Sequence, residues 1–468
     1  MSASHGRAIS AGGLRPNAAA LDSRALTREL GRANALPVLL SLEQTHGDRF
    51  DHFNLNAFWS KFKKLPRGEL GGLRDRLAPV CEQTVRMLPE LDARKVANIA
   101  HAFAKLVGSG PWESVWRALP EAALRSLGGF DAQGLTDTAW AFAKAGHTST
   151  ELFNAISAEV VRRRLEDFNR QHLSNTAWAF AKAGHLSTEL SNVISAEVMR
   201  RELGDFNPQE LSNTAWAFAT AGHLSTELFK AISAEVVRRE LGDFNPQHLS
   251  NTAWAFAKAG HLSTELFKAI SAEVVRRGLG NFNEQDLSNT AWAFAVWNPP
   301  SADTLFGTTS FTTRCAHVET SFPRARLSQL HQWSLWREEL GALWPGLPES
   351  LRQACRNAFV EEEGQTPQLQ SDVVREIRST GDIADVEEEY RCKVSGYSID
   401  ALVTLNHGER IAVEVDGPSH FVGSSYQPNG STLLKHCQLR FFEWRLESVK
   451  YWEWEHSKEL PWLPWRSR

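Results

Sequence analysis

The chain has 468 residues, of which 42% are hydrophobic and 23% charged, and its formal net charge is -4. This length exceeds one ordinary hydrophobic core, so two or more structural units are expected. The composition is globular and excludes a disordered chain. No run approaches the roughly 18 apolar residues of a membrane-spanning helix, and the near-neutral charge weighs against a uniformly basic nucleic-acid-binding protein.

Residues 1–21 contain no acidic residue, are rich in Ala and Ser, and carry Arg7 and Arg15. This composition predicts a flexible N-terminus and is compatible with an organellar transit segment. A loose terminal tail without a targeting role is the alternative.

A motif of 38 residues dominates residues 22–300. The central copy begins Leu211-Ser-Asn-Thr-Ala-Trp-Ala-Phe-Ala-Thr-Ala-Gly222, and degenerate copies precede it at 56–59 and 98–103. The five tryptophans of the motif are each 38 residues apart: Trp140, Trp178, Trp216, Trp254 and Trp292. A period of this size predicts a solenoid, in which neighbouring repeats stack.

Each repeat reads as two helices. Asn207 and Pro208 provide an N-cap and a first helical residue, and Gly222 provides a stop. Ser225 caps the second helix, which Gly242 ends. A single helical hairpin cannot bury both of its apolar stripes, so the repeats must pack against one another.

The pattern changes after Trp297. Residues 301–325 are rich in Thr and Ser and are predicted to form a linker, followed by a terminal helix pair at 326–361. Residues 369–456 are predicted to form a small α/β domain, and residues 457–468 an aromatic tail. The predicted fold is therefore multidomain, an all-α solenoid followed by a small α/β domain.

Within the α/β domain, a helix is expected at 369–379. The β-rich runs 396–405 and 410–416 flank Asn406-His-Gly-Glu409, which is a hairpin signal. A helix at 431–443 and a short strand at 446–452 are expected to follow.

The first helix of each repeat carries a polar line opposite its apolar stripe. One amide and one lysine per repeat could hold a base and a phosphate of single-stranded RNA. A solvated polar face is the alternative reading. The repeated tryptophan is expected to pack between repeats, with base stacking as the sharper alternative. The predicted RNA-binding residues are Asn175, Lys182, Asn213, Asn251, Lys258 and Asn289.

The repeat motif resembles the octotricopeptide-type repeats of algal and protist organellar RNA-binding proteins, over most of residues 50–300. This resemblance implies binding of single-stranded organellar transcripts and a role in their processing, stability or translation. It implies a mitochondrion as the location, with the chloroplast as the alternative.

Three carboxylates are expected on one face of the predicted hairpin. Side chains alternate along a strand, so Glu414 and Asp416 share a face, and the turn brings Asp400 opposite one of them. Crowded carboxylates destabilise a sheet unless a bound Mg²⁺ or nearby basic groups offset their charge, or unless they act as acid and base. His420 and Lys435 could contact a phosphate or a metal-bound water. A solvated acidic face with Lys435 as an ion-pair partner is the alternative.

The segments Tyr397–Asp400, Ile411–Phe421, Leu433–Lys435 and Val449–Trp454 together resemble a RAP domain, over about residues 370–455. RAP domains resemble the PD-(D/E)xK nuclease fold, in particular its very-short-patch-repair branch.

This resemblance assigns roles by position. Asp400 matches the metal-binding Asp of that nuclease fold, and Glu414 matches the Glu of its Glu-x-Lys motif. Asp416 stands where the Lys would be, and Lys435 could replace that lysine from the helix. His420 matches a histidine of the repair-enzyme branch, and Glu376 is an additional candidate ligand.

Three hypotheses of function follow. The preferred one is an organellar RNA-binding protein whose solenoid holds single-stranded RNA. The second is an Mg²⁺-dependent RNA endonuclease that uses Asp400, Glu414, Asp416, His420 and Lys435. The third is a protein–protein scaffold, such as a component of an organellar ribosome or another ribonucleoprotein. None of these hypotheses involves a membrane.

Overall fold

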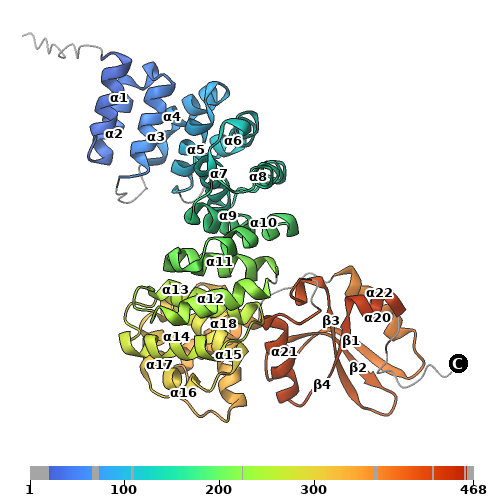
Figure 1. Ribbon diagram of the computed structural model, residues 1–468. Coiled ribbons are helices and arrows are strands. Elements are labelled where there is room, and N and C mark those ends of the chain that lie inside the picture. Colours follow the sequence, from blue (N-terminus) through green and yellow to red (C-terminus); the bar gives the residue numbers. More distant parts are fainter. Residues whose placement is uncertain are drawn as a thin grey trace, which may run out of the picture. The chain divides into compact units, whose positions relative to one another are not determined.

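The computed structural model describes residues 21–65, 73–106, 110–223, 225–361, 367–423, 426–457 and 460. The chain divides into two compact units, residues 1–130 and residues 131–468, and each is described by itself. Figure 1 shows that helices make up most of both units and that the strands lie in the C-terminal part. No helix among the described residues is long and apolar enough to cross a membrane.

The first unit consists of helices, and its degenerate repeat motifs are helical. Trp59 is fully buried, its ring centroid lies 4.4 Å from that of Phe103, and its indole N–H donates to Thr84 Oγ1 at 2.9 Å. The helices are α1 (Ser23–Arg32), α2 (Leu36–His46), α3 (His52–Phe62), α4 (Leu73–Met87), α5 (Ala93–Phe103) and α6 (Glu113–Arg125).

The second unit begins with the repeats, and the predicted pairs of helices are present. First helices pack on first helices of the neighbouring repeats, and the last of them packs on α18. The first helices are α7 (Ala132–Ala145), α9 (Arg170–Lys182), α11 (Pro208–Ala221), α13 (Pro246–Lys258) and α15 (Glu284–Trp297). The second helices are α8 (Thr150–Arg162), α10 (Thr188–Arg200), α12 (Thr226–Arg238) and α14 (Thr264–Arg277).

Local sequence fixes where these helices begin and end. The Asn207 side chain accepts from the backbone N–H of Glu210, and the Glu210 side chain accepts from the N–H of Asn207. This reciprocal cap satisfies two amide groups that the helix leaves unpaired. Gly222 ends α11 with a φ of 69°, a left-handed conformation that glycine adopts without steric cost.

An arginine at the end of α10, α12 and α14 joins neighbouring repeats. Arg239 pairs with Glu235 in its own helix, and its guanidinium donates to the carbonyl oxygen of Leu203 at 2.8 Å and to that of Phe206. Arg201 and Arg277 make equivalent contacts. Much of the repeats' charge is therefore used within the solenoid, which explains their balanced composition.

The predicted linker at 301–325 contains helices. α16 (Ala302–Phe306) and α17 (Ser310–His317) occupy it, because their aromatic residues enter the core. The ring of Phe306 lies 4.9 Å from that of Phe311 and 5.4 Å from that of Trp333. The prediction of a linker from Thr and Ser content was wrong, since burial of these aromatic rings outweighs the polar composition.

The C-terminal part is a four-stranded mixed sheet with strand order β1-β2-β3-β4. β1 and β2, and β2 and β3, are antiparallel, whereas β3 and β4 are parallel and are joined through α21. The elements after α17 are α18 (Arg324–Glu339), α19 (Glu349–Val360), α20 (Gln368–Arg378), β1 (Ile383–Arg391), β2 (Ser398–Leu405), β3 (Arg410–Asp416), α21 (Gly430–Phe441), β4 (Arg445–Lys450) and α22 (Tyr451–Ser457).

Two strands differ from the sequence prediction. β1 was not predicted, because it lies at the edge of the sheet and its run Glu387-Glu388-Glu389 is exposed. Edge strands often carry such charges, which hide their β-pattern. β4 ends at Lys450, and Tyr451 and Trp452 begin a helix instead of continuing the strand.

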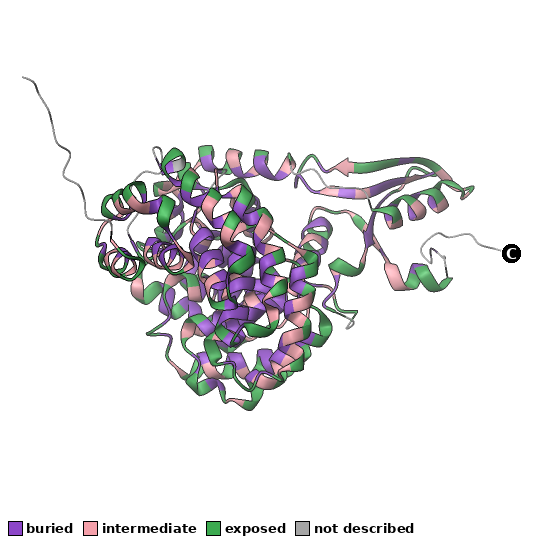
Figure 2. Ribbon diagram, turned by 90° about the horizontal axis from the view of Figure 1, so that it is seen from above, coloured by how far each residue is buried: buried purple, intermediate pink, exposed green. Residues whose placement is uncertain are grey.

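The terminal helix pair α18–α19 shares a hydrophobic core with the sheet. Leu335 and Phe359 pack with Tyr397, Ile399 and Leu439, and buried positions concentrate where helices face other elements (Figure 2). The predicted N-terminal segment 1–21 lies outside the described residues except for Leu21, and so does the aromatic tail except for Ser457 and Leu460.

Candidate functional site

A ladder of tryptophans runs along the first helices of the second unit. Its members are Trp140, Trp178, Trp216, Trp254 and Trp292, and neighbouring ring centroids lie 6.4, 6.1, 6.3 and 6.0 Å apart. The rings therefore pack between repeats, as expected. All but Trp292, which is 3% exposed, remain partly accessible to solvent. The tryptophan ladder thus combines a packing role with partial accessibility to solvent.

The predicted polar line accompanies this ladder. Asn175, Trp178 and Lys182 are spaced by three and four residues, which places them on one face of α9. Lys182 is exposed, and Asn175 and Asn213 are partly exposed. In the middle repeats the ladder is therefore flanked by an amide on one side and by a lysine or threonine on the other.

At the C-terminal end the same line is covered. Asn251 and Asn289 are buried, and the Asn289 side chain donates to Asn251 Oδ1 at 3.2 Å. Arg326 of α18 donates to Asn289 Oδ1 at 3.3 Å. The two asparagines lie between packed helices, because α18 packs on α15. They therefore lack the solvent-exposed position that the RNA prediction requires.

Lys258 of the same line lies against α21. Its Nζ is 3.0 Å from Ser431 Oγ and 3.5 Å from Asn429 Oδ1. Gly430 permits this approach, because a Cβ at that position would overlap the carbonyl oxygen of Ala257. Lys258 therefore joins the last repeats to the sheet-containing part of the unit.

The three predicted carboxylates do share one region of the sheet. β2 and β3 pair with Ala401 opposite Val413, which brings Asp400 next to Glu414, and the backbone N–H of Val415 donates to Asp400 Oδ2 at 2.7 Å. Glu414 and Asp416 are each 1% exposed. The alternative of a solvated acidic face is therefore wrong for these two residues.

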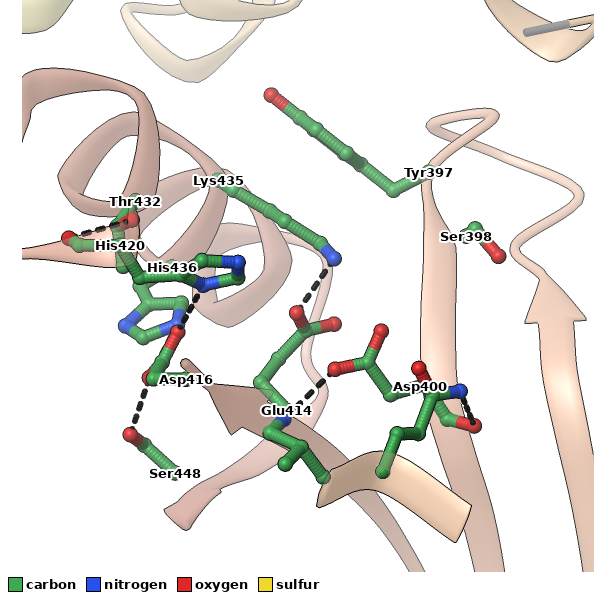
Figure 3. Close-up of polar contacts among 12 residues, drawn as sticks. Tyr397, Ser398, Asp400, Glu414, Asp416, His420, Thr432, Lys435, His436 and Ser448 are labelled. Carbon is green, nitrogen blue, oxygen red and sulfur yellow. Dashed lines mark hydrogen bonds and ion pairs between the residues drawn. The ribbon is translucent and has the colours of Figure 1, made fainter. Parts of the chain in front are cut away.

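Lys435 of α21 provides the charge that offsets Glu414, as Figure 3 shows. Burial raises the pKa of Glu414 to about 8, although Lys435 opposes this effect. Burial also disfavours the Lys435 ammonium, but Glu414 and Asp400 outweigh it and raise the lysine pKa. Burial raises the pKa of Asp400 as well.

Asp416 lies among two imidazoles and a hydroxyl. His420 Nδ1 is 2.7 Å from Asp416 Oδ1, and Ser448 donates to Asp416 Oδ2 (Figure 3). Burial would raise the pKa of Asp416, but the contacts with His420, His436 and Ser448 hold it below its ordinary value. Burial lowers the pKa of His436 to about 4, so this ring is neutral at physiological pH.

These residues do not fit a magnesium ion. A hard divalent cation needs several oxygen ligands around one point, whereas the Glu414 carboxyl group is in contact with the Lys435 ammonium. Among the described residues, no group of three or more His, Cys, Asp or Glu side chains has the arrangement of a metal site. The Lys435 ammonium, and not a metal ion, offsets the charge of the crowded carboxylates.

A cavity of about 270 Å³ opens beside this cluster. Its walls come from α13, from the end of β3 and its following turn, and from the first half of α21. Its lining residues include Lys258, Asp416, His420, Ser431, Lys435 and His436. The cavity thus brings a predicted RNA-binding lysine together with the predicted catalytic residues Glu414, Asp416, His420 and Lys435, whereas Asp400 is not among its lining residues.

Sequence reasoning missed His436, Asn429 and Ser431. The signal for Asn429 was present, since Asn-Gly-Ser before an apolar run is an N-cap pattern, and its side chain accepts from the amides of Ser431 and Thr432. His436 carried no signal, because its position depends on how α21 packs against β3. Glu376 lies on α20 and is not a wall of the cavity.

Comparison with known proteins agrees with this architecture. The profile of a family described as RNA-editing substrate-binding complex 6 protein matches residues 77–298, and that of the RAP domain matches residues 413–460. The chain is therefore a helical-repeat protein with a C-terminal RAP domain.

A curated relative supports the same assignment. It is a chloroplastic RAP domain-containing protein of Oryza sativa subsp. japonica, 33% identical over 110 residues. The match covers 24% of this chain and 16% of the rice protein.

Proposed function

We propose that this protein binds single-stranded RNA in an organelle and acts there in RNA processing, mRNA stability or translation. The observation that carries the proposal is the tryptophan ladder, whose rings stay partly accessible in successive repeats beside Asn175, Asn213 and Lys182. Aromatic side chains stack on bases of any sequence, and a lysine beside them neutralises a phosphate.

The comparisons support this proposal in general terms. The description of the family that matches residues 77–298 names binding of RNA-editing substrates, and the rice relative is chloroplastic. The first description points to RNA and the second to an organelle as the setting. The mitochondrion is the location that we propose, with the chloroplast as the alternative, and ribonucleoprotein components as further partners.

The test is the affinity of the purified chain for labelled single-stranded RNA over a range of salt concentrations. Lys182→Thr introduces the residue that the next repeat carries at the same position, Thr220. We expect weaker binding to RNA. We also expect the slope of log affinity against log salt concentration to fall by about one, as for the loss of one phosphate contact. Trp178→Leu should weaken binding about fivefold or more, since a stacked base contributes roughly 1–3 kcal/mol.

Lys230→Thr is the matched control, because Lys230 lies on a second helix and pairs with Glu227 at 3.1 Å. It should bind RNA like the unmodified protein. Equal loss in Lys182→Thr and Lys230→Thr would contradict an RNA path along the first helices. Association with proteins that is insensitive to salt, without RNA binding, would favour the scaffold.

Denaturing gels of the same mixtures test the nuclease hypothesis. The ion pair between Glu414 and Lys435 disfavours the Mg²⁺ centre, so intact RNA is expected. Shortened RNA that disappears in Glu414→Gln would instead assign hydrolysis to this part of the protein.

A further inference from the structure

We propose that the cavity between α13 and the N-terminal end of α21 binds a phosphate group of the RNA. This inference rests on the proposed function and deepens it, because it gives the strand a defined contact where the repeats meet the RAP domain. Three features favour a phosphate there: the charges that face the cavity, one unpaired ring nitrogen and the continuity of the repeat surface.

The charges of the cavity wall leave one cation unmatched. Glu414 pairs with Lys435, and Asp416 lies 2.7 Å from His420. Lys258 contacts only the neutral oxygens of Ser431 and Asn429, and no described carboxylate forms an ion pair with it. A largely buried ammonium without a counter-charge is unfavourable, and an anion in the cavity would relieve that cost.

Two further features favour an anion at the same place. α21 is 12 residues long, and the positive end of its helix dipole, which attracts negative charge, lies at the cavity. The amides of Ser431 and Thr432 there already donate to the Asn429 side chain, so the attraction comes from the dipole and not from free amides. His436 is 7% exposed, and its Nε2 makes no hydrogen bond although it lies 3.5 Å from Asp416 Oδ2. This unpaired ring nitrogen belongs to the wall of the cavity.

The cavity also continues the proposed RNA path. Lys258 follows Trp254 by four residues on α13, as Lys182 follows Trp178 on α9. A strand that contacts Lys182 and the tryptophan ladder would therefore reach Lys258 and the start of α21. A volume of about 270 Å³ has room for a phosphate with part of its ribose.

Ser431→Asp tests the phosphate site without removing the contact that docks α21. The new carboxylate would pair with Lys258 and suit the first turn of the helix, so the fold should be retained. Because the Lys258 ammonium would then be paired with this carboxylate, RNA binding should weaken at least about tenfold, the usual scale of one lost charge-assisted contact. Lys258→Thr should weaken it similarly, whereas Lys268→Thr, on an exposed site of the second helix of this repeat, should not.

Three RNAs of one sequence separate terminal from internal phosphates. They carry a 5′-phosphate, a 3′-phosphate or hydroxyl groups at both ends. A preference for one phosphorylated end that Ser431→Asp removes identifies a terminal phosphate, and an equal loss for all three identifies an internal one. Wild-type affinity in a Ser431→Asp protein with an unchanged thermal midpoint would overturn the inference.

A nucleoside monophosphate tests the cavity separately from the proposed function. Isothermal titration with the full chain should give binding that Ser431→Asp abolishes, whether or not long RNA binds. Binding of RNA along the ladder with no effect of Ser431→Asp or Lys258→Thr, and no binding of the monophosphate, would leave the proposed function intact and reject the cavity as its phosphate site.

Discussion

At the residue scale, two buried carboxylates, Glu414 and Asp416, determine the electrostatics inside the RAP domain. Each is 1% exposed, and each is offset by a neighbour from another segment, Lys435 in one case and His420 in the other. A buried ion pair must recover the cost of removing both charges from water. The cluster is thus an internal electrostatic unit whose balance depends on pH.

The first prediction concerns the pH dependence of stability. Burial raises the pKa of Glu414 from 4.5 to about 8, so in this interval the folded Glu414–Lys435 pair holds a proton that the unfolded state releases. Its contribution is complete below pH 4.5 and is lost as the pH rises through 8. The free energy of unfolding in urea should therefore fall between pH 6.5 and pH 8.

The double variant Glu414→Gln/Lys435→Met removes both titrating groups of the pair and should flatten this slope. The window excludes the buried His436, whose lowered pKa acts below 6.5. The prediction fails if the slopes of the unmodified and double-variant proteins are the same.

At the scale of elements, Arg239 shows how neighbouring repeats are held together. Its planar group contacts Glu235 on α12 and carbonyl oxygens of the preceding repeat. Arg239→Lys keeps the charge, but an ammonium group cannot reproduce the planar set of donors with which the guanidinium reaches the carboxylate and the carbonyl oxygens. We expect a loss of about 1–3 kcal/mol in the opening free energy of the adjoining helices, measured by hydrogen exchange.

Arg238→Lys is the control for this prediction. The Arg238 side chain is 66% exposed and pairs with Glu235 at 2.7 Å, and it makes no hydrogen bond to a described residue of another repeat. It should leave hydrogen exchange unchanged. Similar losses in Arg238→Lys and Arg239→Lys would show that the helix-internal pair, and not the contact between repeats, carries the stabilisation.

The approach of α21 to α13 gives a second prediction at this scale. Gly430→Ala places a Cβ where the carbonyl oxygen of Ala257 lies, so α21 must move away from α13. Such overpacking costs about 1–3 kcal/mol. Gly417→Ala is the control, because a Cβ there meets no described atom within 4 Å. Only Gly430→Ala should lower the thermal midpoint and increase exchange at the N-terminal amides of α21.

At the scale of the second unit, the sheet shares part of its hydrophobic core with α18 and α19. His331 of α18 contacts the Ser395 carbonyl at 2.7 Å, and Gln332 donates to the Tyr397 hydroxyl at 2.8 Å. A chain of residues 367–468 would expose Tyr397, Ile399 and Leu439, which α18 and α19 cover in the whole protein. We therefore expect this fragment to aggregate.

A fragment of residues 324–468 retains α18 and α19 and should be more soluble, which size-exclusion chromatography can measure. Equal solubility of both fragments would show that the RAP domain folds without the helix pair. The shared core also means that α18–α19 act as part of the RAP domain, although their sequence resembles a continuation of the helices.

The sequence by itself determined the features that depend on local pattern. The 38-residue period, the Asn caps, the Gly stops and the alternation along β2 and β3 predict the repeat helices and the hairpin, because short-range geometry fixes these elements. The same alternation placed Asp400 opposite Glu414 or Asp416, and the register of β2 and β3 decided for Glu414.

Only the tertiary structure decided which of these residues are accessible and what offsets their charge. Asn251 and Asn289 carry the same motif as Asn175, yet they are buried because α15 and α18 pack together. Lys435 reaches Glu414, and Lys258 reaches Ser431, across long separations in the chain. Burial and charge pairing depend on how helices and strands pack against one another, and the periodicity of the sequence does not predict that packing.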